Sequence, residues 1–117
     1  MSISKEVLLE KMGKAHVVVL DIRSGPEFEE FHIRGSHHFD LGPDPGAFAQ
    51  AVEMKHGRDK FFIVYGSSSL FPAAEDAALA LRKRGLWAEA YPEGMEGWHG
   101  VAYPAEGTRA REKAVIP

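Results

Sequence analysis

The 117-residue sequence contains no cysteine. This absence excludes disulfide bonds, thiolate metal sites, iron–sulfur clusters and every mechanism that uses a cysteine nucleophile or a redox-active thiol. The six histidines do not replace such a site: His37 and His38 are adjacent, and neighbouring residues of a strand point to opposite faces, so they cannot easily share one ion. No His-x-x-x-His pair occurs either. We therefore expect no metal and no cofactor.

Long apolar runs and an excess of one charge are also missing. No apolar stretch approaches the roughly 20 residues that span a bilayer, and the amino terminus lacks the apolar core of a signal peptide. The formal net charge is -3, the pI is near 6.1, and there is no long basic tract, so we expect neither a nucleic-acid nor a membrane partner. The length suits one soluble domain, cytoplasmic by default or part of a larger protein.

The most informative stretch is the apolar run at residues 61–65, which stops abruptly in small hydroxyl residues. An apolar run without polar alternation is typical of a strand covered on both faces, as in the parallel sheets of α/β domains. Gly66 and the serines after it predict a tight loop, and Pro72 suits the first turn of a helix that ends before Gly85. The buried face of this helix is marked by residues at helical spacing: Ala74, Ala77, Ala78 and Leu81.

The loop after a parallel strand is the default place for ligand chemistry in an open α/β sheet. Backbone N–H groups at the start of the following helix can converge on an anion. Here, however, Glu75 and Asp76 open that helix and occupy the positive end of its dipole. We therefore expect the loop to bind anions weakly at best.

Upstream, the sequence predicts further helices and strands in alternation. Ser4 is expected to cap a short helix that Gly13 ends. Residues 17–20 predict a second buried strand, followed by a short helix over residues 24–31 and a short strand over residues 37–41.

The next helix is expected to begin at Asp44-Pro45 and to end near Gly57. Its predicted buried face comprises Phe48, Ala51 and Val52. This alternation of strands and helices indicates an α/β fold with a mainly parallel central sheet of about five strands.

Downstream of the central helix the pattern weakens. Residues 87–91 predict a shorter strand, and the glycines within residues 94–100 predict a turn-rich segment that carries Trp98. From Ala105 onward the chain is polar and unpatterned, which predicts a loosely held tail.

Three stretches together resemble the rhodanese-like domain family. Residues 19–23 (Val-Leu-Asp-Ile-Arg) and 27–36 (Glu-Phe-Glu-Glu-Phe-His-Ile-Arg-Gly-Ser) resemble a strand ending in Asp-x-Arg followed by Glu-(Phe/Tyr)-x-x-Gly-His-Ile-Pro-Gly-Ala. The strand and loop around Tyr65 resemble the family's active-site loop. Residues 93–98, with Tyr-Pro at 103–104, resemble its closing Gly-Gly-x-x-x-Trp and Gly-(Tyr/Phe)-Pro signatures.

The resemblance runs from about Ile3 to Glu106 and implies a rhodanese-like domain at residues 1–106 with a C-terminal tail at residues 107–117. Active members hold a cysteine as the first residue of the loop, where it carries a persulfide between a donor such as thiosulfate and an acceptor such as cyanide or a thiol. Gly66 occupies that position here. The resemblance therefore implies the fold without a catalytic residue.

The loop departs from the family pattern at further positions. Residues 66–71 contain no arginine, whereas common active loops carry one. Phe71 stands where a longer loop variant has a second cysteine. The remaining loop residues are Ser67, Ser68, Ser69 and Leu70.

The resemblance also implies structural roles for residues near the site. Asp21, Arg23 and Glu27 are expected to form an ion-pair network at the strand end, in which the loss of one partner would leave an unpaired charge. His32 is expected to be a hydrogen-bonded packing residue, and Trp98 a lid over the core.

Several alternatives follow for the loop itself. A serine nucleophile would need a base and an orienting carboxylate, and no signature ties either to the loop, so we expect the serines to satisfy backbone groups in a turn. Phe71 either anchors a partner or folds inward over the helix start. Our hypothesis is a non-catalytic binding or regulatory module with an unknown protein partner or small ligand at the loop. The alternatives are an enzyme that uses a loop serine and an engineered thiosulfate sulfurtransferase with glycine in place of cysteine.

Overall fold

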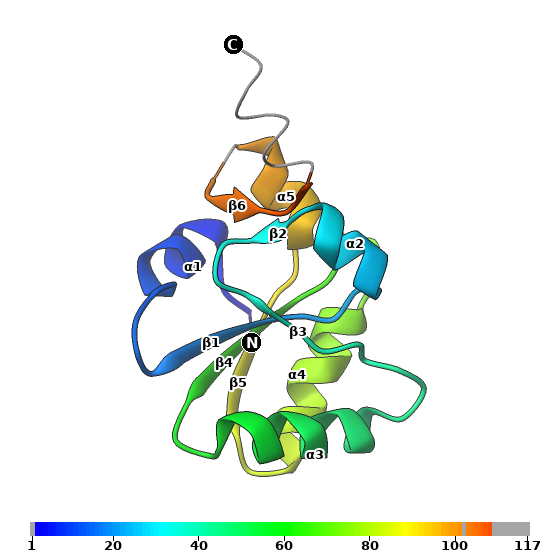
Figure 1. Ribbon diagram of the computed structural model, residues 1–117. Coiled ribbons are helices and arrows are strands. Elements are labelled where there is room, and N and C mark those ends of the chain that lie inside the picture. The colour runs from blue at the N-terminus through cyan, green and yellow to red at the C-terminus, as the bar shows by residue number, and fades with distance from the viewer. Residues whose placement is uncertain (1, 102, 109–117) are drawn as a thin grey trace.

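Four parallel strands form the central sheet, in the order β3-β1-β4-β5 (Figure 1). The computed structural model describes residues 2–101 and 103–108. The strands are β1 (Val17–Asp21), β3 (His37–His38), β4 (Phe61–Tyr65) and β5 (Trp87–Tyr91). Asp21 pairs with Tyr65, and Tyr65 pairs with Tyr91. The last residues of the three long strands therefore lie side by side at the carboxyl edge of the sheet, which is where ligand sites form in such folds.

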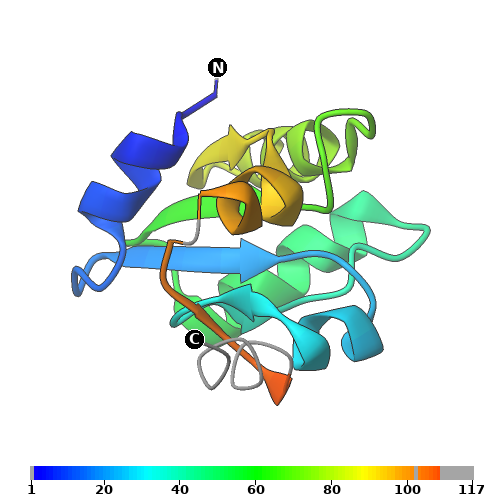
Figure 2. The same ribbon diagram turned by 90° about the horizontal axis from the view of Figure 1, so that it is seen from above.

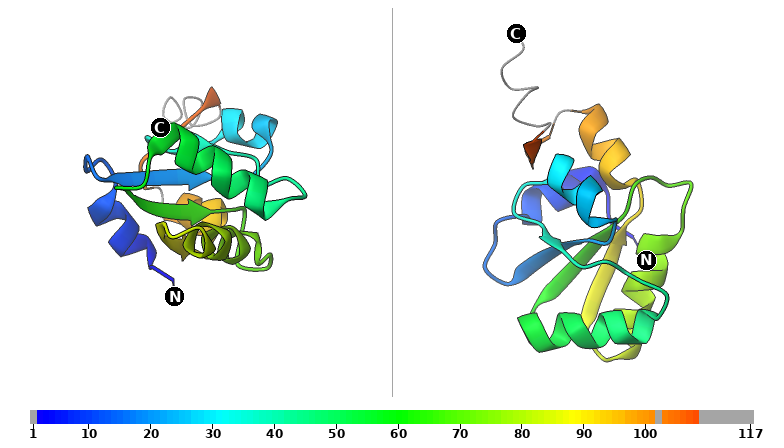
Figure 3. Two further views of the ribbon diagram at one scale, coloured as in Figure 1. Left: turned by 90° about the horizontal axis from the view of Figure 1, so that it is seen from below. Right: turned by 45° about the vertical axis from the view of Figure 1, so that its right-hand side comes forward.

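Helices cover both faces of this sheet. They are α1 (Lys5–Lys11), α2 (Gly25–Glu30), α3 (Pro45–His56), α4 (Ala73–Lys83) and α5 (Gly94–Gly100). Figure 2 shows α5 on the near side of the sheet, and the left view of Figure 3, from below, shows α3 in front on the opposite side. None of the described helices is long and apolar enough to cross a bilayer.

The alternation of side chains in β4 explains the two layers. Phe61, Ile63 and Tyr65 join the core under α1 and α5, whereas Phe62 and Val64 join the core against α3 and α4. Successive residues of a strand point to opposite faces, so a strand that is apolar at every position needs cover on both sides. All five side chains are buried, as the sequence predicted.

Local capping signals are present where the sequence predicts them. The Ser4 hydroxyl accepts a hydrogen bond from the Val7 amide at 3.2 Å, and Asp44 accepts bonds from the first amides of α3. Each such cap stabilises a helix end by about 1 kcal/mol. Pro72 occupies the N-cap position of α4, without a side-chain cap.

The central sheet has four strands rather than about five. A separate antiparallel pair joins β2 (His32–Ile33) to β6 (Ala105–Glu106). The expectation of a loose tail from Ala105 onward is therefore wrong for these two residues, because pairing with β2 orders them. Of the tail expected at residues 107–117, residues 107 and 108 are described and lie just after β6, and residues 109–117 lie outside the described residues.

The expectation of a turn-rich segment at residues 94–100 is also wrong, because this segment is the helix α5. Met95 and Trp98 lie three residues apart, on one helical face, and both are buried. Their burial against the sheet outweighs the low helix propensity of three glycines, which costs about 1 kcal/mol for each. The helix brings residues to the carboxyl edge of the sheet that a turn would not have placed.

Two smaller expectations also need correction. On α3 the buried side chains are Phe48, Ala49 and Val52, and Ala51 is exposed. The strand expected over residues 37–41 is only two residues long, although Phe39 and Leu41 still pack against the core.

Candidate functional site

The loop after β4, residues 66–72, is hydrogen-bonded to the start of α5. The carbonyl oxygen of Gly66 accepts a hydrogen bond from the Met95 amide at 2.9 Å, and that of Ser67 accepts one from the Glu96 amide at 2.9 Å. A Cβ atom at Gly94 would lie 2.5 Å from the Gly66 oxygen, so the close approach requires glycine there. Two first-turn amides of α5 are thus used to hold the loop.

The outer part of the loop forms a tight turn around Ser68. Its carbonyl accepts a hydrogen bond from the Phe71 amide, and its hydroxyl accepts one from the Leu70 amide, both at 3.3 Å. Ser68 is buried, which fits a turn-forming role better than that of a nucleophile. The turn presents Leu70 and Phe71 to solvent, with exposed fractions of 82% and 62%. Phe71 therefore does not fold inward over α4.

Asp21 and Arg23 form a buried ion pair behind the loop. The guanidinium of Arg23 donates to both carboxylate oxygens of Asp21, the shortest bond being 2.7 Å, and also to the Phe31 carbonyl at 2.5 Å. Burial alone would lower the pKa of Arg23. The hydrogen bonds to Asp21 and the negative charge of Asp21 outweigh burial, so the pKa of Arg23 is raised. Glu27 does not join the pair by a hydrogen bond; it forms a capping box with Ser24 at the start of α2.

His32 and Trp98 make contacts that hold the β2–β6 strand pair in place. The Nδ1 of His32 donates to the Phe28 carbonyl at 2.5 Å, and its ring stacks on Phe28 with 3.8 Å between centroids. Trp98 is fully buried and donates through Nε1 to the Pro104 carbonyl at 2.8 Å. Neither ring lines the cavity described below.

The hydroxyl of Tyr65 anchors the segment that follows β2. It accepts a hydrogen bond from the Ile33 amide at 3.1 Å and lies 3.1 Å from the Ser36 hydroxyl. Burial, and then the charge of nearby Asp21, raise the pKa of Tyr65 well above its ordinary value. The hydroxyl is therefore a neutral structural group. This contact was not predicted from the sequence, because Tyr65 appears there only as the last apolar residue of a strand.

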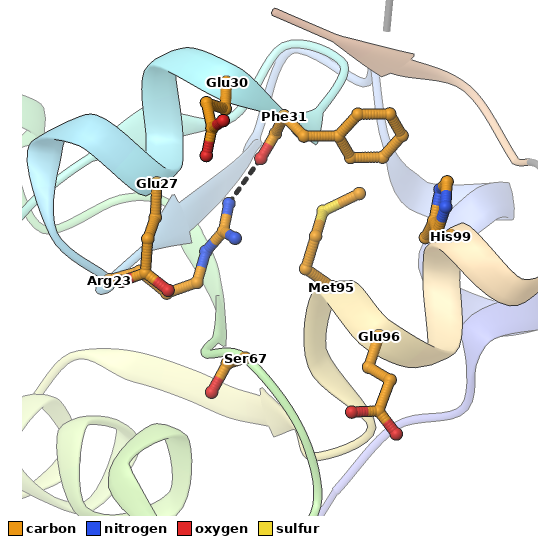
Figure 4. Close-up of a pocket in the computed structure, with 8 residues that line it drawn as sticks. All are labelled: Arg23, Glu27, Glu30, Phe31, Ser67, Met95, Glu96 and His99. Atoms are coloured by element: carbon orange, nitrogen blue, oxygen red, sulfur yellow. Dashed lines mark hydrogen bonds between the residues drawn. The ribbon is translucent and has the colours of Figure 1, made fainter. Parts of the chain in front are cut away.

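A cavity of about 370 Å³ lies between α2, α5 and the first part of the loop (Figure 4). In Figure 4 carboxylates from α2 and α5 lie on opposite sides of it, with apolar side chains and Ser67 between them. Its lining comprises Arg23, Glu27, Glu30, Phe31, Ser67, Met95, Glu96 and His99.

The charge of this cavity is predominantly negative. Three carboxylates line it, and its guanidinium, Arg23, is already paired with Asp21. A dianion such as thiosulfate would enter against this charge. The sequence did not predict Met95, Glu96 and His99 as site residues; the buried spacing of Met95 and Trp98 was the available signal for the helix that carries them.

The comparison with known families is decisive for the fold. The profile of the rhodanese-like domain matches residues 4–101. The chain belongs to the rhodanese-like domain family. A search of curated proteins found no significant match.

Solved structures show the same fold. The chain is similar to the BH2092 protein from Bacillus halodurans, with a TM-score of 0.78 and 19% identity over 92% of this chain and 77% of that one. The rhodanese-like domain of Alr3790 from Anabaena sp. has a TM-score of 0.75 and 19% identity, over 99% and 83% of the two chains. EanB, solved with ergothioneine linked to a persulfide cysteine, has a TM-score of 0.75 and 20% identity, over 92% of this chain and 28% of that chain.

Gly66 is the notable position in this rhodanese-like domain. A Cβ atom there would meet nothing within 4 Å, and its backbone does not lie in the left-handed region. The Cβ atom that a cysteine would add therefore fits at Gly66 without backbone strain.

A second hollow, of about 280 Å³, lies against the outer part of the same loop. Its lining includes one carboxylate, from Glu75, and otherwise small or apolar side chains: Ser69, Leu70, Phe71, Pro72, Ala74, Glu75 and Pro92. Within residues 2–101 and 103–108, no three His, Asp or Glu side chains are grouped so as to hold a metal ion.

Proposed function

We propose that this rhodanese-like domain is a non-catalytic binding module and that residues 66–72 form its recognition surface. The observation that carries the proposal is Gly66 at the start of the loop, in a chain without any cysteine. Sulfur transfer through a persulfide needs a thiolate, and a serine oxygen cannot carry the sulfane sulfur. The acidic cavity beside Gly66 supports the same conclusion, because it disfavours anionic sulfur donors.

The second candidate is an enzyme that uses a loop serine. Ser67 lines the same cavity as Glu96 and His99, which is the observation in its favour. Among the described residues, however, no hydrogen bond joins a loop serine to a histidine, and the Ser68 hydroxyl is engaged by the Leu70 amide. A serine nucleophile requires a base within hydrogen-bond reach. The geometry therefore supports this candidate less well.

Steady-state turnover by the native chain tests the proposal against this candidate. Thiosulfate with cyanide probes sulfur transfer, and p-nitrophenyl acetate and p-nitrophenyl phosphate probe a serine nucleophile. We expect rates equal to those of protein-free controls. Saturable turnover that Ser67→Ala or Ser68→Ala abolishes, in variants with unchanged circular dichroism, would overturn the proposal.

A further inference from the structure

The loop carries an exposed apolar pair, Leu70 and Phe71, on a backbone that is held in place. The other large exposed apolar residues described in the structure are separated from one another in sequence: Leu9, Met54, Leu79, Trp87 and Val101. Leu70 and Phe71 are adjacent, follow the hydrogen-bonded turn at Ser68, and line a hollow of about 280 Å³. Aromatic and apolar side chains on a rigid support bind partners at a lower entropic cost than mobile ones.

Acidic side chains occur at both ends of the loop that carries this apolar pair. Glu75 lines the hollow beside Phe71, and Asp76 follows in the first turn of α4. The cavity at the other end of the loop adds the carboxylates of Glu27, Glu30 and Glu96.

Among the described residues, none of the salt bridges involves Glu75, Asp76 or Glu96. Arg23 is paired with Asp21, and Lys5 lies 3.0 Å from Glu93. Each of these pairs is internally balanced. The surface around the loop therefore attracts cations and repels anions.

We infer that the loop binds a protein segment in which apolar side chains alternate with lysine or arginine. This inference rests on the proposed function and specifies the partner of the same site. Exposed side chains such as Leu70 and Phe71 insert into a partner, whereas a small ligand alone would occupy only a concave site. Basic residues of the segment would lie against Glu75 at one end of the loop and against Glu96 at the other, which gives charge complementarity across the contact.

The negative charge around the loop disfavours two other partners that could bind an exposed apolar pair, nucleic acids and membranes. Nucleic acids present a dense row of phosphates, and the cytoplasmic leaflet of a membrane carries a negative surface potential. Both would meet the carboxylates of α2, α4 and α5 with like charge. A cationic protein segment is the partner that satisfies the apolar and the acidic side chains together.

Titration of the native ¹⁵N-labelled chain with three synthetic peptides of equal length tests the inference. The first peptide alternates lysine with leucine and phenylalanine, the second replaces lysine by glutamate, and the third replaces the apolar residues by serine. We expect only the first to shift the amides of residues 66–76 and 94–97, with at least about tenfold tighter binding than either control. Its affinity should fall as the ionic strength rises from about 50 to about 300 mM, because salt screens exposed charges.

Variants locate the contact and control for changes elsewhere. Leu70→Ser with Phe71→Ser should weaken the first peptide at least about tenfold, whereas Met54→Ser, which alters a 78% exposed residue on α3, should not. The double variant Glu75→Lys with Glu96→Lys should weaken binding of the first peptide by a similar factor. Glu10→Lys, a single charge reversal of the same kind at an exposed position of α1, should leave the affinity nearly unchanged.

The outcomes separate this inference from the proposed function. If the glutamate or serine peptide binds at the loop as tightly as the first, the partner class is wrong while the binding module stands. If no peptide shifts the loop at about 1 mM, or if charge reversal at positions 75 and 96 has no effect, the inference is overturned. Turnover by the native chain is a separate measurement, and it alone would overturn the non-catalytic function.

Discussion

Gly94 and Gly66 approach so closely that a Cβ atom on Gly94 would lie 2.5 Å from the Gly66 carbonyl oxygen. Gly94 also has φ of 66°, in the left-handed region that glycine adopts without a steric penalty. The next residue, Met95, donates its amide to the same oxygen. The start of α5 and the start of the loop are therefore one structural unit.

Gly94→Ala should lower the free energy of unfolding by about 2 kcal/mol or more, because it adds both backbone strain and a clash with backbone atoms. Chemical denaturation of both proteins measures this. Gly100→Ala is the matched control: it lies in the same helix, has open space around it, and should leave stability unchanged or raise it by at most about 1 kcal/mol. Equal effects of the two substitutions would show that the close approach is not a constraint.

Tyr65 and Tyr91 give a second matched pair. They are paired across β4 and β5 and are both fully buried, but only the Tyr65 hydroxyl has hydrogen-bond partners among the described residues. Tyr65→Phe leaves the buried Ile33 amide without an acceptor and should cost about 1 to 3 kcal/mol.

Tyr91→Phe removes a hydroxyl that is buried without a partner, so stability should be unchanged or higher. Urea unfolding of the two variants measures the contrast. A larger loss for Tyr91→Phe than for Tyr65→Phe would contradict the hydrogen-bond pattern described here.

The sequence predicted the fold well where one signal dominates. The uninterrupted run at β4 is typical of a strand with cover on both faces, and the caps at Ser4 and Asp44 act through local hydrogen bonds. It failed at α5, where helix formation depends on the burial of Met95 and Trp98 and not on propensity. It also failed at β6, because two residues carry no periodicity and pair only through tertiary contact.

The candidate site was predicted only in part. The position of the loop and the absence of any cysteine from it follow from the sequence. The acidic cavity does not, because it brings together α2 and α5. The orientation of Phe71 was left open by the sequence, and the turn at Ser68 determines it.

His37 and His56 should make stability depend on pH. The centroids of their rings are 4.8 Å apart. The pKa of each histidine is lowered, mainly by burial and also by the positive charge of Lys55. The charge of His37 further lowers the pKa of His56. The unfolded chain, with histidine pKa values near about 6.5, then binds more protons than the folded one. The free energy of unfolding should therefore fall as the pH drops below about 6.5.

Denaturation at pH values from about 7.5 down to about 5 measures this dependence. In His56→Gln, which removes one titrating ring, the slope over this range should be smaller. His16→Gln alters an exposed histidine and serves as the control. An unchanged slope in His56→Gln would contradict the predicted role of the pair.

The most direct test of a non-catalytic loop is thiosulfate:cyanide turnover by the native chain, Gly66→Cys and Gly66→Cys/Glu96→Arg, side by side, with circular dichroism to confirm folding. We predict no turnover by the native chain and little by Gly66→Cys, since the added Cβ atom has open space but the cavity remains acidic. The double variant should exceed Gly66→Cys in kcat/KM by about tenfold, which corresponds to about 1.4 kcal/mol of electrostatic stabilisation. Turnover by the native chain above the uncatalysed rate would contradict the central claim, because the loop would then perform chemistry without a thiol.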